Sequence, residues 1–171
     1  MNLKTLLDEI NNNTIDVLNL GHLLDNYDTS LNDTREIIKA LYINKSVHTL
    51  KINFSCVIGS NGAKMVSDML CVNTSISTLN ITENWIESEG AIYLANMLRT
   101  NTTLRTLILD EGDIGSIGFD ALVKSLCVNT TLQVLYLNDH GLICSTELAN
   151  MLSINKSLLT LNLSTSKINH D

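Results

Sequence analysis

The sequence predicts an α/β solenoid, in which short parallel strands line a concave face and helices line the convex face. The first observation behind this prediction is a repeat: residues 74–101 are followed by residues 102–129 with the same landmarks at the same spacing. The second is an L-x-x-L-x-L pattern at the start of each unit, as in Leu104, Leu107 and Leu109. The third is an aliphatic helical pattern that follows, ending at Leu98 and Leu126. We expect about five repeats of roughly 26 to 32 residues in a right-handed curve.

The elements follow in order along a single domain, residues 1–171. Leu3, Leu6, Leu7 and Ile10 predict that residues 1–11 form an N-terminal capping helix, because the open end of a solenoid must be covered. The predicted repeats cover residues 12–44, 45–73, 74–101, 102–129 and 130–155, and residues 156–171 form a partial C-terminal repeat. Residues 21–33 break the pattern, which predicts a loop followed by a helix from about Asp33.

Three landmarks recur within these units. Serines at 60, 88 and 116 precede each helix, and we interpret them as N-caps. Glycines at 62, 90 and 118 then predict a close approach of helix and strand layers. Asparagines at 44, 73, 101, 129 and 155 end each unit, and we interpret them as left-handed turn residues that stop the preceding helix.

Composition limits the classes of function. The formal net charge of −7 argues against nucleic-acid binding, which needs Lys and Arg on the surface. No apolar stretch is long enough for a membrane span, and the N-terminus does not resemble a secretion signal. The four cysteines have no paired spacing, so we expect free thiols in a reducing compartment, the cytoplasm.

Nothing in the sequence indicates catalysis. The histidines at 22, 48, 140 and 170 lack partners at metal-ligand spacing, and phosphate-binding glycine motifs are absent. His140, Asp139 and Cys144 lie together in sequence, but neighbours in one loop rarely have the mutual geometry that a Cys–His nucleophile needs. We therefore expect a protein that is not an enzyme and that uses no metal and no cofactor.

The 28-residue unit with a full helix resembles the ribonuclease-inhibitor-like class of leucine-rich repeats over about residues 12–171. The order of segments, including REIIKALYINKSVHTLKI and STELANMLSINKSLLTLNL, looks like the leucine-rich repeat domain of tropomodulins and leiomodins. That resemblance implies actin as a partner, since those proteins bind actin at filament pointed ends.

The residues themselves predict where a partner binds. Ile108 and Tyr136 are neighbouring apolar residues on the concave face, and Trp85 lies in a loop position that projects. Acidic residues surround them, which favours a partner with a basic surface. The predicted partner-binding residues are Trp85, Ile108, Asp110, Glu111, Asp113, Tyr136, Asn138 and Asp139. The alternative is that Trp85 packs on its neighbouring loops and the acids only confer solubility.

Two hypotheses of function remain at this point. The first is a non-catalytic protein–protein interaction scaffold that binds through its concave face and adjacent loops. The alternative is a structural or assembly protein that self-associates through the open edge of its C-terminal repeat, because an uncovered strand edge is a template for pairing.

Overall fold

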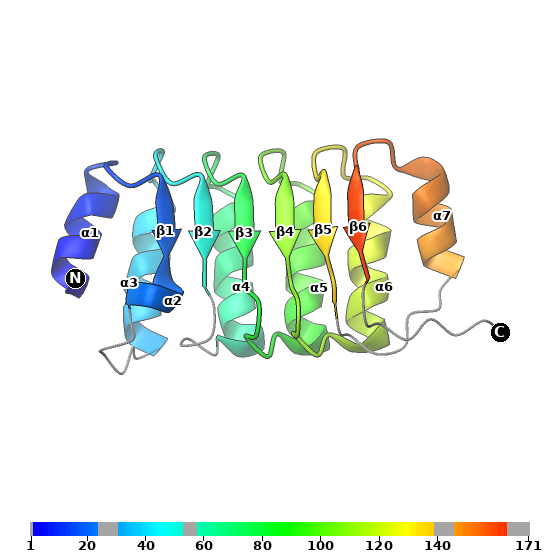
Figure 1. The fold of residues 1–171 in the computed structure, drawn as a ribbon, viewed down its shortest axis with the longest axis horizontal. Helices are drawn as coiled ribbons and strands as arrows, with labels where there is room; N and C mark the ends of the chain where they lie inside the picture. The colour runs from blue at the N-terminus through cyan, green and yellow to red at the C-terminus, as the bar shows by residue number, and fades with distance from the viewer. Residues whose placement is uncertain (1, 24–30, 53–57, 139–145, 164–171) are drawn as a thin grey trace.

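The computed structural model describes residues 2–23, 31–52, 58–138 and 146–163, and within them the side chains of residues 22, 23 and 31 are not described. The strands form one parallel sheet in sequence order, β1 to β6 (Figure 1). They are β1 Val17–Asn19, β2 Thr49–Lys51, β3 Thr78–Asn80, β4 Thr106–Ile108, β5 Val134–Tyr136 and β6 Thr160–Asn162. The helices are α1 Leu3–Asn11, α2 Leu20–Leu23, α3 Leu31–Leu41, α4 Gly59–Leu70, α5 Glu87–Leu98, α6 Gly115–Leu126 and α7 Thr146–Ile154.

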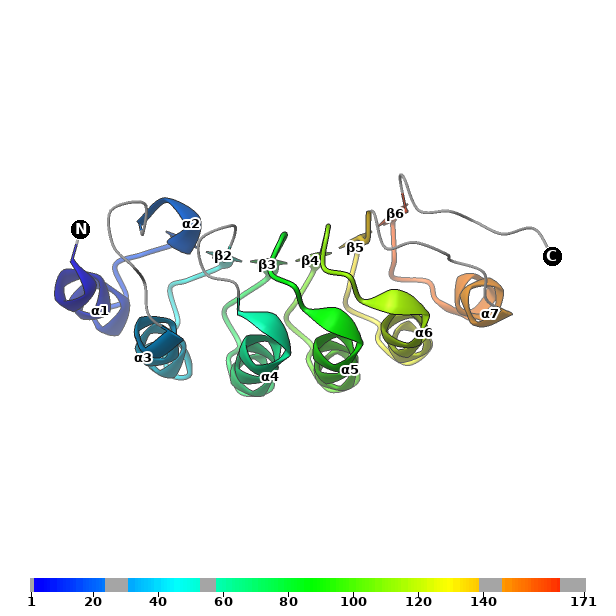
Figure 2. The same ribbon diagram turned by 90° about the horizontal axis from the view of Figure 1, so that it is seen from below.

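The sheet and the helices form two curved layers. Figure 2 shows α3 to α7 following an outer arc with the strands on its inner side. The concave sheet and convex helices predicted from the repeat are therefore confirmed. Among the described residues, the chain runs up through a helix, turns, and returns through the next strand. The strand-to-helix loops after β3 and β4 therefore lie along one edge of the sheet, and the helix-to-strand turns lie along the other (Figure 1).

The strand leucines form the centre of the core. Leu79 pairs with Leu107, and Leu107 with Leu135, in adjacent parallel strands. All three side chains are completely buried. Leu94 and Leu98 of α5, one helical turn apart, are also fully buried and face this row. The aliphatic residues of each repeat thus contribute to one continuous interior, as the L-x-x-L-x-L pattern predicts.

The asparagines that end the repeats form a hydrogen-bonded ladder between neighbouring repeats. In each, Nδ2 donates at 2.6–2.7 Å to a carbonyl at the C-terminus of the preceding repeat's helix, and Oδ1 accepts at 2.7–3.1 Å from the backbone N–H groups two and three residues ahead. We call Asn44, Asn73, Asn101, Asn129 and Asn155 the asparagine ladder. The interpretation of these residues as left-handed turn residues is wrong, because none of them has a positive φ. They satisfy carbonyls that a helix end leaves without partners.

The interpretation of the recurring serines as N-caps is also wrong. Helices α4, α5 and α6 have isoleucine at the N-cap position, with no side-chain capping bond. Ser60 and Ser88 lie just inside their helices, and each hydroxyl donates to a backbone carbonyl of the next repeat: Ser60 to Ile86 at 2.8 Å and Ser88 to Ile114 at 2.7 Å. The serines therefore join repeats instead of starting helices.

The helix glycines allow close packing, but against a different neighbour from the one predicted. A Cβ at Gly118 would lie 2.8 Å from Cβ of Ala91 and 3.2 Å from Cα of Ser88, both in α5. The same holds at Gly90, where a Cβ would lie 3.0 Å from Cβ of Ala63 in α4. The close approach is thus between successive helices on the convex side, not between helix and strand.

The N-terminal part differs in one detail from expectation. The predicted capping helix is α1, in which Leu6 and Ile10 are buried and the Asn2 side chain accepts a hydrogen bond from the backbone N–H of Thr5 at 2.8 Å. The expected loop over residues 21–33 is wrong at both ends, since α2 continues to Leu23 and α3 already begins at Leu31. Of the four cysteines, Cys71 and Cys127 are free thiols, and Cys56 and Cys144 lie outside the described residues.

Candidate protein-binding rim

Two strand-to-helix loops carry most of the predicted binding residues. Residues 81–87, from the loop after β3 to the first residue of α5, and residues 109–115, from the loop after β4 to the first residue of α6, lie side by side at one edge of the sheet (Figure 1). Together they contain five acidic residues and no Lys or Arg. We call Glu83, Trp85, Glu87, Asp110, Glu111 and Asp113 the acidic rim.

The backbone of the acidic rim is left-handed at alternate residues. Glu83, Trp85 and Glu87 have φ values of 60°, 50° and 58°, and Glu111 and Asp113 in the next loop have 58° and 48°. Non-glycine residues in this conformation cost roughly 1–3 kcal/mol each and persist only where the surroundings impose them. Strain that recurs in two adjacent loops marks this edge of the sheet as a candidate functional region.

Hydrogen bonds between the loops hold this backbone in place. The N–H of Glu83 donates to the carbonyl of Asp110 at 3.0 Å, and the N–H of Glu87 donates to the carbonyl of Gly112 at 2.9 Å. The N–H of Glu111 donates to the carbonyl of Asn138 at 3.2 Å, which continues the pattern to the next repeat. The loops are therefore arranged before any partner binds.

Asn84 fixes the position of Trp85. Its side chain is fully buried, and Nδ2 donates to the carbonyl of Thr82 at 2.9 Å and to the carbonyl of Ile52 in the preceding repeat. The Asn84 side chain thus caps backbone groups inside the turn. With Asn84 directed inward and Ile86 fully buried, Trp85 between them projects outward and is 61% exposed. The alternative in which Trp85 packs on its neighbouring loops does not fit this exposure.

The structure brings the remaining predicted residues into two pairs. Ile108 and Tyr136 are direct partners in adjacent strands, and both are half-buried on the concave face. Asp110 lies beside Asn138, where its Oδ1 accepts the backbone N–H of Asn138 at 2.9 Å. Asp139, the last predicted residue, lies outside the described residues.

Like charges crowd within the acidic rim. Partial burial raises the pKa of Glu83, and the nearby Glu111 carboxylate raises it further. A nearby cation would favour the ionised form of Glu83. Glu83 is one of the acidic residues that the sequence places around Trp85. Glu87 was not predicted as part of this surface, although the absence of any Lys or Arg between residues 81 and 87 indicates it.

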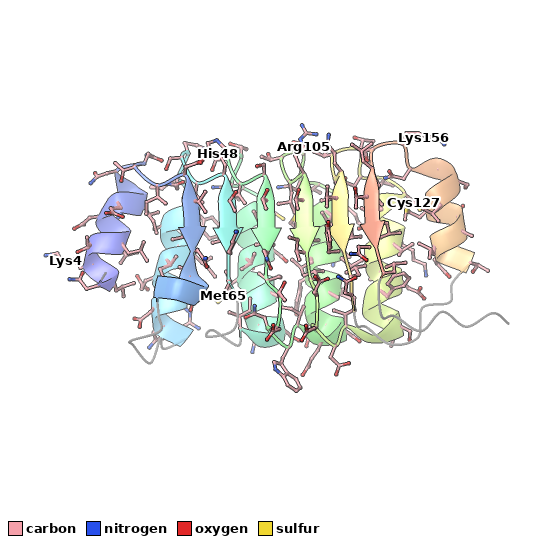
Figure 3. The ribbon with its side chains drawn as sticks, viewed as in Figure 1. Lys4, His48, Met65, Arg105, Cys127 and Lys156 are labelled. Carbon is pink, nitrogen blue, oxygen red and sulfur yellow. The ribbon has the colours of Figure 1, made fainter. Side chains whose placement is uncertain are left out.

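The opposite edge of the sheet, at the helix-to-strand turns, carries a different set of side chains. Figure 3 shows His48, Arg105 and Lys156 along this edge. The ring of His48 pairs with the Asp16 carboxylate, with 2.6 Å between Nδ1 and Oδ1. These basic residues were not predicted as functional. The sequence indicates them because basic residues lie in the helix-to-strand turns, whereas acidic residues lie in the strand-to-helix loops after β3 and β4.

Other kinds of site are not observed in the described residues. No cluster of three or more His, Cys, Asp or Glu side chains there is arranged to hold a metal ion. None of the helices in the same residues is long and apolar enough to cross a membrane.

Comparison with known proteins identifies two of the repeats. A family model described as "Leucine Rich repeat" matches residues 72–95 and 100–123. Comparison with curated proteins gives no match. Among solved structures, the chain is similar to "Leiomodin-1 Actin-Binding Site 2 (ABS2)", with a TM-score of 0.67 and 20% identity, covering 90% of this chain and 91% of that one.

A second similar structure is the tropomodulin C-terminal domain of Caenorhabditis elegans, with a TM-score of 0.70 and 14% identity over 90% of each chain. At such identities the likeness establishes the fold alone. The chain is therefore an α/β solenoid that matches the leucine-rich repeat model over residues 72–95 and 100–123, and its fold is shared with the leiomodin and tropomodulin domains.

Proposed function

We propose that this chain is a non-catalytic, cytoplasmic scaffold that binds a partner protein through the acidic rim and the adjoining concave face. The observation that carries the proposal is the exposed Trp85, held on left-handed backbone between a buried asparagine and a buried isoleucine. Tryptophan is among the side chains that most often anchor protein interfaces. A rigid anchor also loses little conformational freedom on binding, which favours affinity.

The concave face extends this anchor. Ile108 and Tyr136 supply apolar area next to Asp110 and Asn138, and both strands are fixed by the parallel ladder. The partner would cover the aromatic and aliphatic side chains while its Lys or Arg side chains meet the surrounding carboxylates. Those cations would offset the repulsion between Glu83 and Glu111.

Actin is the first partner to test. The similar leiomodin-1 structure is described by its title as an actin-binding site, and the fold of this chain matches it over 90% of its length. Fold similarity does not fix function, so the test is direct binding. Co-sedimentation with filaments and elongation assays with barbed ends blocked would measure side binding and pointed-end capping separately.

The variants make this test specific to the rim. We expect Trp85→Ala and Tyr136→Ala each to weaken binding by tenfold or more, about 1.4 kcal/mol or above. Ile117→Ala is the control, because Ile117 is 67% exposed but lies on α6, outside the rim and the concave face. Equal binding by the wild type, Trp85→Ala and Tyr136→Ala would contradict the proposed surface. Absence of actin binding would leave the rim but remove actin as its partner.

A second candidate function is self-association through the C-terminal repeat. Leu152 in α7 is 56% exposed and Leu159, next to β6, is 76% exposed, while Leu161 and Leu163 are only half-buried. Apolar residues on the last described strand favour a copy-to-copy contact at this edge. Light scattering of the wild type and of Leu152→Lys would test it. Dimers that persist in Leu152→Lys would contradict this edge as the interface.

A further inference from the structure

The turns from helix to strand carry the opposite charge to the acidic rim. Residues 42–48, 71–77, 99–105, 127–133 and 153–159 contain two Lys, two Arg and one His, and no Asp or Glu. The first such turn, residues 12–16, holds one acid, Asp16, which pairs with His48. In a chain of net charge −7 this is a segregation along the strand direction, with the cations at one edge of the sheet and the carboxylates of the acidic rim at the other. We call Lys45, Arg99, Arg105 and Lys156 the basic rim.

These cations are not neutralised within the described part of the chain. Lys45 Nζ donates to the Thr74 hydroxyl at 3.2 Å, and Lys156 Nζ donates to the Ser153 carbonyl at 3.1 Å. Arg105 Nη1 donates to the carbonyl of Thr131 at 3.3 Å. Since these acceptors carry no charge, the positive potential of the rim remains available to a partner's carboxylates.

An apolar row runs beside the basic rim. The residue before each ladder asparagine is a β-branched aliphatic in four of the five turns, and all four are exposed: Ile43 75%, Val72 58%, Val128 56% and Ile154 49%. The asparagine ladder fixes the backbone next to each one. β-Branched side chains are stiff at χ1, so burying them costs little rotamer entropy.

A groove lies at the C-terminal end of this row. It has a volume of about 560 Å³ and is lined by Leu126, Ile154 and Leu159, with Lys156 also at its wall. An aromatic side chain fits such a volume, and a cation beside it would contact the ring face or a neighbouring carboxylate. The basic rim therefore suits a partner that presents an exposed aromatic residue among acids.

We propose that this partner is a second copy of the chain, bound through its acidic rim. That rim supplies the required chemistry, with Trp85 61% exposed among five acidic residues. Arg99 and Arg105 lie between α5 and β4, in the same central repeats whose other edge carries Glu83 and Glu111. Stacking along the strand direction brings the acidic rim against Arg99 and Arg105. In that register Trp85 faces the central part of the apolar row, and the groove beside Lys156 lies away from it at the C-terminal end.

The contact joins two different surfaces, so it is heterologous and leaves one free rim at each end. The result is an open-ended stack whose length depends on concentration. This inference rests on the proposed use of the acidic rim for binding, and it names the basic surface that the rim meets.

The test compares charge reversals at the two rims with matched reversals elsewhere. Sedimentation velocity would be measured for the wild type, Glu111→Lys and Arg105→Glu. Asp8→Lys and Lys4→Glu are the controls, since both residues are exposed on α1 and change the net charge by the same amounts. We expect concentration-dependent association of the wild type and both controls, and at least a tenfold weaker association of each rim variant.

Mixing and salt complete the experiment. A mixture of Glu111→Lys and Arg105→Glu should associate again, because the first keeps its basic rim and the second keeps its acidic rim. Raising the salt from about 0.05 M to 1 M should weaken the contact, as the Debye length falls to about 3 Å. Trp85→Ala should also weaken the contact. Because this substitution leaves the net charge unchanged, its effect would show the contribution of the tryptophan side chain itself.

Three outcomes would overturn the inference: a wild type that stays monomeric, association that is equal in the rim variants and the controls, or a mixture that does not recover. The second would direct attention to the C-terminal edge. If the wild type is monomeric but binds a basic protein in a way that depends on Trp85, self-association is refuted and the proposed scaffold function stands.

Discussion

Replacing the central ladder residue Asn101 tests how the repeats are held together. Its side chain is only 6% exposed, and it makes three hydrogen bonds to backbone: Nδ2 to the carbonyl of Leu70 at 2.7 Å, and Oδ1 from the N–H groups of Thr103 and Leu104 at 2.9 and 2.7 Å. Asn101→Ala leaves these groups without partners in a dry turn. At roughly 1 kcal/mol or more for each buried group left unpaired, we expect a loss of about 3 kcal/mol.

Asn101→Asp separates the donor from the acceptor. The carboxylate still accepts from Thr103 and Leu104, but it no longer donates to Leu70 and faces that carbonyl with a negative charge. Burial and this repulsion raise the pKa of the new carboxyl above its unfolded value near 3.9. The protonated form donates as the amide did. Relative to the wild type, the variant should therefore lose stability as pH rises through the window above about 4 and regain it as pH falls.

Urea unfolding followed by circular dichroism at pH 7 and at about pH 4 would measure both effects, with the wild type at each pH as reference. Asn155→Ala is the matched control. It breaks the equivalent bonds to Leu126, Ser157 and Leu158, but Asn155 is half-buried, so water can replace them and the loss should be smaller. A loss below about 1 kcal/mol for Asn101→Ala, or a pH-independent deficit for Asn101→Asp, would refute this reasoning.

Three further predictions concern the core, the convex side and the acidic rim. Leu107→Ala removes a fully buried side chain from the centre of the sheet and should cost about 2–5 kcal/mol in chemical unfolding. Gly118→Ala should cost about 1–3 kcal/mol, because its Cβ would lie 2.8 Å from that of Ala91; unchanged stability would mean that α5 and α6 can move apart. Glu111→Gln should lower the pKa of Glu83 toward its ordinary value in an NMR titration, with burial keeping part of the shift, and an unmoved pKa would contradict their coupling.

The fold could be predicted from the sequence because the spacing of the leucines shows which side chains are buried. Leucines at fixed offsets have no other physical explanation than a shared interior, and the parallel register of Leu79, Leu107 and Leu135 follows from their equivalence. The cap over the N-terminal end followed equally well from the apolar stripe of α1. Loop ends were less predictable, as α2 and the start of α3 illustrate.

The recurring serines and asparagines were identified correctly from the sequence, but their hydrogen-bond partners were not. Ser88 and Asn101 recur because each side chain donates a hydrogen bond to another repeat, to a carbonyl 26 and 31 residues away. Local sequence rules describe caps and turns within one element, so they cannot identify a contact that exists only after stacking. The same limit hid the left-handed backbone at Glu83 and Glu111, where non-glycine residues occur against expectation.

Because every ladder amide closes the helix of the unit before it and orders the turn of its own, each repeat carries both halves of the connection. An insertion of one complete period, such as a tandem copy of residues 74–101, would bring its own amide together with the carbonyl that the following unit requires. Such a lengthened chain should fold without redesigned junctions. A single residue inserted between Asn101 and Thr103 would instead displace the acceptor from both donors and interrupt the connection at that one junction.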